Sequence, residues 1–206
     1  MRRIEIPLSE DAVRSLEVGD SVLLSGTLVT ARDAAHQWMV DTFIRKSRTP
    51  EGEDEDIHER LRSLLRGGGI YHCGPVVAGL KTKEYVFKAA GPTTSIREEP
   101  YQAEVMEHFG VRAVIGKGGM GSKTLAACAR GPAVYLHAIG GAATLIAKTI
   151  KRVKQVYKLE FGVPEALWVI EAEDFPAVVT MDSGGHSLHS QVESLSRGVL
   201  EELLGS

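Results

Sequence analysis

The stretch Val111-Arg112-Ala113-Val114-Ile115-Gly116-Lys117-Gly118-Gly119-Met120-Gly121 carries the clearest fold signal in the chain. Its first half is a short apolar run typical of a buried strand, and its second half is a glycine-rich loop. A helix capped by Ser122 is predicted to follow, and then a further strand at Ala133 to His137. Because strand, loop and helix alternate here, the sequence predicts an α/β fold with a parallel layer.

A second stretch, Gly91-Pro92-Thr93-Thr94-Ser95-Ile96-Arg97, lies just upstream and resembles the glycine loop in its chemistry. A glycine-rich loop before a helix leaves backbone N–H groups free to bind an anion, and the helix start adds a positive dipole end. The upstream turn offers hydroxyls and a guanidinium, which can hold a carboxylate through two hydrogen bonds. A purely structural reading stays open, in which the hydroxyls cap a helix and Arg97 pairs with Glu98 or Glu99.

Arg32 is the third candidate for anion binding, because it lies at the start of a predicted helix. Thr30 and Asp33 fit a capping box there, and a cation in a first helical turn is unfavourable unless an anion is close. Pairing with Asp33 or simple solvation would explain Arg32 equally well. The first part of the chain is predicted to form strands at 3–6 and 21–24, a helix that starts after Ser9, and a helix from 31 to 44.

The remaining elements follow from turn residues and periodicity. Residues 46–57 form a predicted acidic loop with five acids between Glu51 and Asp56, too mobile to fix a metal. Predicted strands lie at 70–77, broken by Gly74-Pro75, and at 85–90, 167–171 and 177–181; predicted helices lie at 57–65, 100–109 with Gly110 ending it, 122–130, 142–156 and 190–204.

Length and composition predict one globular domain over residues 1–206, since hydrophobic residues make up 43% and charged residues 25%. The N-terminus lacks the apolar segment of a secretory signal and no run is long enough for a membrane helix, so a cytoplasmic location is expected. The two cysteines, Cys73 and Cys128, are too few for a disulfide framework and are expected to be buried.

The charge distribution of one half of the chain favours anionic ligands, and neither a nucleic acid nor a membrane is expected as a partner. No Asp or Glu occurs from His108 to Leu159, whereas that segment holds nine Lys and Arg residues. The loop at Gly116 formally matches a dinucleotide fingerprint, but the acid that should bind the ribose is missing, and the lysine spacing does not fit a Walker A loop. A pair at His186 and His189 lacks a third metal ligand, while His36, His72 and His137 are interpreted as core or helix-surface residues.

Five motifs in order resemble the class I, iron-sulfur fumarate hydratase and L(+)-tartrate dehydratase family: Ser25-Gly26-Thr27, Thr30-Ala31-Arg32-Asp33-Ala34-Ala35-His36, Tyr71-His72-Cys73-Gly74-Pro75, the turn at 91–97 and the loop at 116–120. The resemblance is strongest to the C-terminal domain, which is a separate β subunit in two-subunit members. Glu98-Glu99 departs from the family pattern, where Met-Asp often follows the arginine.

The resemblance implies a swivelling β/β/α domain with a parallel or mixed sheet and a small β-rich part. It also implies an α subunit that carries a [4Fe-4S] cluster on three cysteines, so that this chain is active only in a heteromer and binds no metal itself. A homodimer or an α2β2 assembly would both be compatible. The implied reaction is the reversible hydration of a dicarboxylate, fumarate to (S)-malate, with L(+)-tartrate or a mesaconate-type substrate as alternatives.

Carried over by position, the resemblance makes Thr93 and Arg97 catalytic candidates. It makes Arg32, Thr94, Lys117, Gly116 and Gly118 candidates for substrate binding. Several cations in one site agree with two substrate carboxylates and a developing negative charge. Threonine is a weak base, so Thr93 would need an Asp of the other subunit. An alternative from another class is a standalone module that binds an anion or a nucleotide with the same loops.

Overall fold

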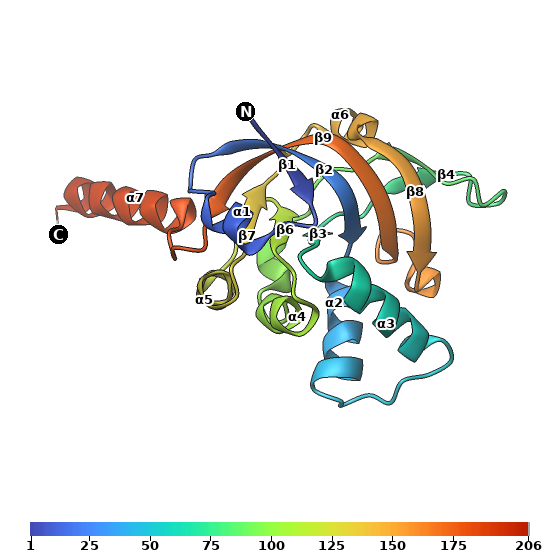
Figure 1. The fold of residues 1–206 in the computed structure, drawn as a ribbon. Helices are drawn as coiled ribbons and strands as arrows, with labels where there is room; N and C mark the ends of the chain where they lie inside the picture. Colours follow the sequence, from blue (N-terminus) through green and yellow to red (C-terminus); the bar gives the residue numbers. More distant parts are fainter. Residues whose placement is uncertain (206) are drawn as a thin grey trace.

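The computed structural model describes residues 1–205, and these form a mixed α/β fold built on one large sheet (Figure 1). The seven-stranded sheet of this described part has the order β1-β2-β3-β6-β7-β9-β8, and a further ladder joins β2 to β9. Neighbours β2, β3, β6 and β7 are parallel, whereas β9 is antiparallel to β2, β7 and β8. The predicted α/β class with a mixed sheet and a small separate β part is therefore confirmed.

The strands are β1 (Arg2–Ile6), β2 (Ser21–Thr30), β3 (Gly69–Tyr71), β4 (Val76–Ala78), β5 (Val86–Ala89), β6 (Ala113–Gly116), β7 (Val134–His137), β8 (Ile150–Tyr157) and β9 (Leu167–Met181). The α-helices are α1 (Glu10–Arg14), α2 (Asp33–Met39), α3 (Asp54–Leu65), α4 (Gln102–Phe109), α5 (Ser122–Arg130), α6 (Ala143–Thr149) and α7 (Leu188–Leu204). A π-helical turn η1 (Val40–Ile44) continues α2, and 3-10 turns lie at η2 (Ser95–Glu98) and η3 (Leu159–Phe161).

Two hydrophobic cores lie on the two faces of the sheet, because side chains of a strand alternate between faces. Along β6, Val114 belongs to the core that packs against helices α2 to α5, and Ile115 to the core that packs against β1, α1 and α6. In Figure 1, α2, α3, α4 and α5 lie on one side of the sheet and α6 on the other. Four helices therefore cover one face of the sheet, and helices α1 and α6 pack on the other.

The predicted helix over residues 142–156 is wrong in its second half. Helix α6 ends at Thr149, and the chain continues as strand β8, which pairs antiparallel with β9. Apolar residues at 150, 153 and 156 have a spacing that suits a helix, but Ile and Val are also strong strand formers. Pairing with β9 makes residues 150–157 a strand. An ion pair of 3.0 Å between Lys151 on β8 and Glu173 on β9 also joins the two strands.

One long strand replaces a pair of shorter predicted strands, and another extends beyond its predicted end. Strand β9 runs from Leu167 to Met181 through Asp174, which has φ +52°, and β2 runs through Gly26 with a register shift opposite this point. The two irregularities are joined by a hydrogen bond of 3.1 Å from the Asp174 N–H to the Ser25 hydroxyl. Bulges like these interrupt the sequence pattern of a strand without ending the strand.

Three helix starts also differ from the prediction. Helix α2 has Arg32 at its N-cap, and the Thr30 hydroxyl accepts a bond from the Trp168 N–H instead of capping the helix. Helix α5 has Gly121, not Ser122, at its N-cap. Helix α3 begins at Asp54, so the predicted acidic loop ends earlier than residue 57; the Asp54 carboxylate is buried and accepts a bond of 2.8 Å from the Lys158 ammonium.

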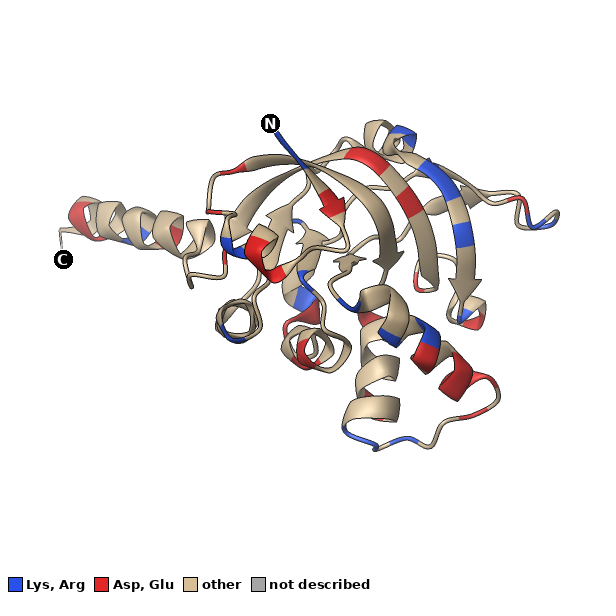
Figure 2. Cartoon of the chain, in the orientation of Figure 1, with Lys and Arg blue, Asp and Glu red and all other residues tan. Residues whose placement is uncertain are grey.

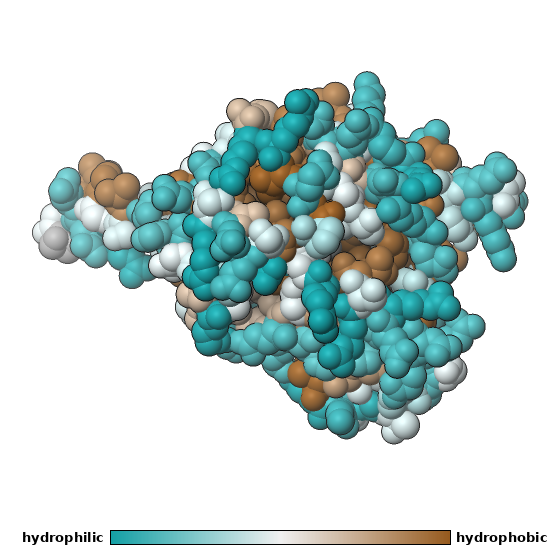
Figure 3. Space-filling model, viewed as in Figure 1, coloured by the Kyte–Doolittle hydropathy of each residue, from teal (hydrophilic) through white to brown (hydrophobic). Residues whose placement is uncertain are grey.

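The C-terminal helix α7 projects away from the sheet in Figure 1. It carries exposed apolar side chains, which give the projecting end its brown patches in Figure 3, namely Val192, Leu195, Val199, Leu200, Leu203 and Leu204. None of the helices in the described part combines the length and the apolar character that crossing a membrane requires. The helix ends as predicted, close to the C-terminus.

Candidate functional site

The candidate site lies where the parallel strands β2, β3, β6 and β7 end. Their carboxyl ends meet at one edge of the sheet, which is where α/β proteins commonly bind ligands. The segments that follow them carry Arg32, His72, Lys117 and Ala138 in turn. Backbone hydrogen bonds continue past the strand ends and keep these segments side by side: Ala31 N to Tyr71 O at 3.1 Å, His72 N to Ile115 O at 2.8 Å and Ala138 N to Gly116 O at 2.8 Å.

The turn at 91–97 packs directly beside the glycine loop. The Thr93 N–H donates to the His72 carbonyl at 2.8 Å, and the Thr93 carbonyl accepts from the Lys117 N–H at 3.3 Å. The Ser95 N–H then donates to the Lys117 carbonyl at 2.9 Å, so that Thr94 and Lys117 form a parallel bridge. The two stretches that the sequence marks as anion-binding candidates are therefore parts of one continuous surface.

Thr93 and Lys117 both present polar groups that this chain leaves unpaired. The Thr93 hydroxyl is buried and has no hydrogen-bond partner within residues 1–205. The Lys117 side chain lies near Gly140 and forms no ion pair with the described residues. A buried hydroxyl without a partner costs free energy, and the Lys117 ammonium, which has no carboxylate within the described residues, is suited to an anion from outside the chain.

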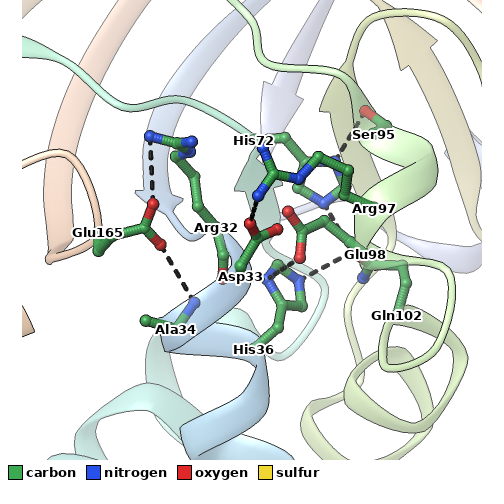
Figure 4. Close-up of polar contacts among 10 residues, drawn as sticks. All are labelled: Arg32, Asp33, Ala34, His36, His72, Ser95, Arg97, Glu98, Gln102 and Glu165. Atoms are coloured by element: carbon green, nitrogen blue, oxygen red, sulfur yellow. Dashed lines mark hydrogen bonds and ion pairs between the residues drawn. The ribbon is translucent and has the colours of Figure 1, made fainter.

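Arg32 and Arg97 lie close together but hold different carboxylates (Figure 4). The Arg32 Nη1 atom is 3.2 Å from Glu165 Oε1, and the other oxygen of Glu165 accepts a bond of 3.1 Å from the Ala34 N–H. Arg97 donates to the Asp33 carboxylate. The sequence-based alternatives, Arg32 with Asp33 and Arg97 with Glu98 or Glu99, are both wrong, because each arginine reaches an acid on another segment.

Gly116 is required by packing at the site. A Cβ atom there would lie 1.8 Å from the Ser95 hydroxyl and 3.1 Å from Nδ1 of His72. Gly118 has φ +80°, a backbone conformation that favours glycine. The glycines thus allow the loop to lie close to the turn that carries Thr93 and Thr94.

The start of helix α5 already holds an anion from this chain. The Glu99 carboxylate accepts bonds from the N–H groups of Gly121 at 2.8 Å, Lys123 at 2.9 Å and Thr124 at 3.2 Å, and from the Thr124 hydroxyl at 2.6 Å. A carboxylate at this position satisfies the free N–H groups of the first turn and complements the helix dipole. The predicted positive helix end is therefore not available to a ligand, and side chains must supply the charge.

Below the surface, two histidines share the side chain of Gln102. The Nε2 atoms of His36 and His72 lie 3.0 Å and 2.7 Å from the Gln102 amide oxygen, and the His72 N–H donates to it. His72 Nδ1 accepts from the Ser95 hydroxyl at 2.8 Å, and the Tyr135 hydroxyl donates to Ser95 at 2.9 Å. Burial lowers the pKa of His72 to about 3, which keeps this ring neutral. The interpretation of His36 and His72 as core residues is confirmed, since both are fully buried.

Glu98 connects this buried network to the arginines. Its side chain is nearly inaccessible, and one carboxylate oxygen lies 3.5 Å from Nδ1 of His36. Burial, and next a hydrogen bond with Asp33, raise the pKa of Glu98 to about 9, so that it is a neutral acid at pH 7. The row of side chains Arg97, Asp33, Glu98 and His36 therefore connects a surface cation to the buried histidines.

The sequence could point to only part of this arrangement. Asp33, His36 and His72 lie inside recognisable motifs, but local patterns suggest a helix cap for the first and core packing for the others. Gln102 and Glu165 carry no such signal, because their partners are distant in sequence: Gln102 meets His36 from 66 residues away and Glu165 meets Ala34 from 131 residues away. Contacts between residues so far apart in sequence form only when the strands have assembled into the sheet.

The thiols of this chain do not fit an iron-sulfur cluster. Cys73 and Cys128 are both buried, and they belong to the two different hydrophobic cores. Burial raises the pKa of each thiol to about 12, whereas cluster ligands are thiolates. Within residues 1–205, no group of three or more His, Cys, Asp or Glu side chains is arranged to hold a metal ion. The two thiols and the other described side chains therefore do not fit the ligand set of an iron-sulfur cluster.

Comparison with known proteins gives one family. The family model described as Fumarase C-terminus matches residues 1–192. A Geobacillus stearothermophilus protein with the provisional name fumarate hydratase class I is 48% identical over 193 residues, which are 94% of this chain and 34% of that protein. A Methanocaldococcus jannaschii protein with the provisional name L(+)-tartrate dehydratase subunit beta is 36% identical over 200 residues, 96% of each chain. The Escherichia coli L(+)-tartrate dehydratase subunit beta is 33% identical over 190 residues, covering 92% of this chain and 87% of that subunit. The chain thus spans about a third of the first relative and nearly all of the second.

Proposed function

The chain belongs to the Fumarase C-terminus family, and on that premise we propose that it is the β subunit of a hydro-lyase that reversibly hydrates a dicarboxylate. The relatives carry the names of fumarate hydratase and of tartrate dehydratase. We propose fumarate to (S)-malate as the reaction, with L(+)-tartrate or a mesaconate-type acid as the alternative substrate. The proposed setting is the cytoplasm, in complex with an α subunit.

The single observation that carries this proposal is the hydrogen-bonded contact between the 91–97 turn and the glycine loop. It brings the unpaired Thr93 hydroxyl and the unpaired Lys117 ammonium together at one strand edge. Arg32 and Arg97 add two guanidinium groups, and an ion pair with a carboxylate of this chain holds each of them in place. Three cations suit a substrate with two carboxylates whose negative charge increases in the transition state.

In this proposal each of the candidate residues has a separate role. Arg32, Arg97 and Lys117 bind and orient the two carboxylates, and Thr94 with the backbone at Gly116 and Gly118 shapes the surface against them. The Thr93 hydroxyl lies at the carbon that loses or regains a proton. Because a threonine hydroxyl is a weak base, an acidic residue of the α subunit assists it. The cluster of the family is carried by the α subunit, since the two thiols of this chain do not fit it.

Exposed apolar side chains near the site support a protein partner. Ile96 is 50% exposed in the turn, and Ile139 is 58% exposed just after β7. Large apolar side chains that flank polar binding groups are typical of an interface with another protein. The proposed α subunit would cover them and exclude water from the cations.

A standalone module that binds a nucleotide remains the competing function. The α5 N-terminus, which such a module would use for phosphate, is filled by Glu99. We therefore expect no tight nucleotide binding by the isolated chain. Isothermal titration with ATP, NAD and GTP tests this expectation, and a dissociation constant in the micromolar range would replace the hydro-lyase proposal.

Anaerobic co-expression with the α subunit tests the proposal directly. The isolated chain should be inactive, and the complex should convert at least one of fumarate, malate, tartrate and mesaconate. Lys117→Ala in the complex should abolish turnover while the absorption spectrum of the cluster is unchanged. Lys123→Ala is the matched control, because Lys123 is an exposed cation on the following helix. Normal turnover by Lys117→Ala would contradict the assignment.

Thr93→Val separates function from folding. Valine has nearly the shape of threonine, and the replaced hydroxyl has no partner within the described residues. The variant should keep or raise the Tm of the isolated chain, because a buried unpaired hydroxyl is removed. It should nevertheless lose turnover in the complex. A variant that keeps turnover would exclude a chemical role for Thr93.

A further inference from the structure

A cavity with several basic side chains in its lining lies away from the candidate site, between η1, α3 and α4. Its volume is about 490 Å³, and basic side chains enter it from three segments: Lys46 and Arg48 follow η1, Arg62 comes from α3, and His58 and His108 come from α3 and α4. Figure 2 shows basic residues both in the segment that follows η1 and on α3 above it. The cavity is reached from the outer, helical side of the molecule.

The cations of this cavity are poorly neutralised by the chain. Lys46 and Arg62 form no ion pair within residues 1–205, and Arg48 reaches Glu51 only at 3.9 Å. Glu55 is the carboxylate among the residues that line the cavity. Glu51 beside Arg48 and Glu59 beside His58 are further acids nearby, so the attraction for anions rests on Lys46 and Arg62, the lining cations without an ion pair within residues 1–205.

The two histidines meet inside the cavity. Their Nε2 atoms are 2.8 Å apart, so that one ring donates an N–H and the other accepts it. The His58 ring also stacks on Phe43 with centroids 4.3 Å apart, which fixes its orientation. A bond of this kind requires at least one neutral ring, and the second proton can be added only if a negative charge offsets the repulsion.

The wall of the cavity contains a further group without a partner. Thr42 lines the cavity, its side chain is 2% exposed, and its hydroxyl has no hydrogen-bond partner within the described residues. It lies in η1, where the helix widens to a π-helical turn. Turns of this type often occur at functional sites, because they change the direction of a few side chains at some cost in stability.

We propose that this cavity, formed by Lys46, Arg48, Arg62 and the His58–His108 pair, binds a phosphate-type oxyanion, free or as a phosphate monoester. The guanidinium groups of Arg48 and Arg62 and the ammonium of Lys46 supply several hydrogen-bond donors to the cavity. A tetrahedral dianion has enough oxygen atoms to accept hydrogen bonds from all three groups. A single carboxylate would leave several of these donors unpaired. The site is separate from the proposed substrate site, because His108 lies at the opposite end of α4 from Gln102.

Binding at this site should be coupled to protonation of the histidine pair. The groups that face the two rings are Arg62, Lys46, Glu55 and Glu59. Burial, followed by the neighbouring charges, lowers the pKa of His58 and of His108. A bound anion favours the protonated rings, so affinity should be high at low pH and fall as the pH rises through the pKa of the anion-bound pair.

Isothermal titration of the full chain with sodium phosphate at low ionic strength tests the site. One phosphate should bind per chain, and Arg62→Gln should weaken binding by about tenfold, the effect of losing one charge-assisted hydrogen bond. Arg60→Gln is the matched control, since Arg60 is an exposed cation on the same helix that does not line the cavity. Succinate should bind more weakly than phosphate.

The pH dependence is measured with sulfate, which keeps its charge over the range, so that any change comes from the protein. Sulfate should bind several times more tightly at pH 5.5 than at pH 8, and the double variant His58→Asn/His108→Asn should remove this difference. No binding at 10 mM phosphate, equal weakening by Arg62→Gln and Arg60→Gln, succinate binding as tight as phosphate, or sulfate binding independent of pH would each overturn the proposal. Circular dichroism of every variant confirms that it is folded.

Discussion

Replacing Glu98 by glutamine should stabilise the protein, and increasingly so as the pH rises. Glu98 is 1% exposed, and its pKa in the folded chain is about 9, compared with an ordinary value of 4.5. A carboxyl group whose folded pKa is raised contributes stability that is fully present below pH 4.5 and is lost as the pH rises toward 9. Glutamine cannot ionise, so the variant avoids this loss and keeps an N–H that can donate to Asp33.

The size of the effect follows from the shift. Each pH unit above the ordinary value changes the free energy of unfolding by about 1.4 kcal/mol, so Glu98→Gln should be more stable than the parent chain by about 3 kcal/mol at pH 7 and by much less at pH 4.5. Urea denaturation of both proteins at pH 4.5, 6, 7 and 8 measures the difference.

Glu107→Gln serves as control, because Glu107 is an exposed carboxylate paired with Arg130 at the surface. We expect it to change stability by no more than about 0.5 kcal/mol at any pH. A difference between Glu98→Gln and the parent chain that stays constant with pH, or that decreases as the pH rises, would show that Glu98 is already ionised in the folded chain. The neutral state of Glu98 at pH 7 would then be refuted.

Three further variants test individual contacts. Glu99→Ala removes the carboxylate that caps α5, which should cost about 2 kcal/mol and lower the Tm by about 4–8 °C; an unchanged Tm would mean that water replaces the cap fully. Gly116→Ala places a methyl group 1.8 Å from the Ser95 hydroxyl, and urea denaturation should show a loss of at least about 2 kcal/mol, whereas a loss below 0.5 kcal/mol is incompatible with this packing. Lys158→Met leaves the buried Asp54 carboxylate unpaired and should cost about 3 kcal/mol at pH 7; because pairing lowers the pKa of Asp54, the loss should shrink as the pH falls through the acid range, and a loss that is constant with pH contradicts the pair.

The order of most elements follows from the sequence, because local signals and tertiary contacts agree there. Gly110 ends α4 with φ +71°, as its position after Phe109 predicts, and Ser9 caps α1 through the Ala12 N–H. The prediction fails at 150–156, where the apolar spacing suits a helix and only the neighbouring strand makes the segment extended. The local pattern of residues 150–156 does not show where strand β9 lies, because β9 is formed by a later part of the chain.

The candidate site shows the same division. Arg32, Thr93, Arg97 and Lys117 could be selected from sequence because each lies in a turn after a predicted strand or at a helix start. Their carboxylate partners could not be, and the acids next in sequence were the wrong candidates for both arginines. Adjacent side chains in a helical or turn segment point in different directions, so an acid beside an arginine in sequence is a poor guide to its partner.

The position of Glu99 changes which groups can hold the substrate. A glycine loop followed by a helix usually supplies backbone N–H groups and a positive dipole end to an anion, but here the N–H groups of the first turn already bond to a carboxylate of the same chain. The charge for a dicarboxylate must therefore come from side chains, and Lys117 lacks a carboxylate within the described residues while Arg32 and Arg97 are each held by one. A cation with a carboxylate partner is fixed in place but partly neutralised, whereas an unpaired cation contributes its full charge. Lys117 should for this reason contribute more to substrate binding than either arginine, and the arginines should contribute more to its orientation.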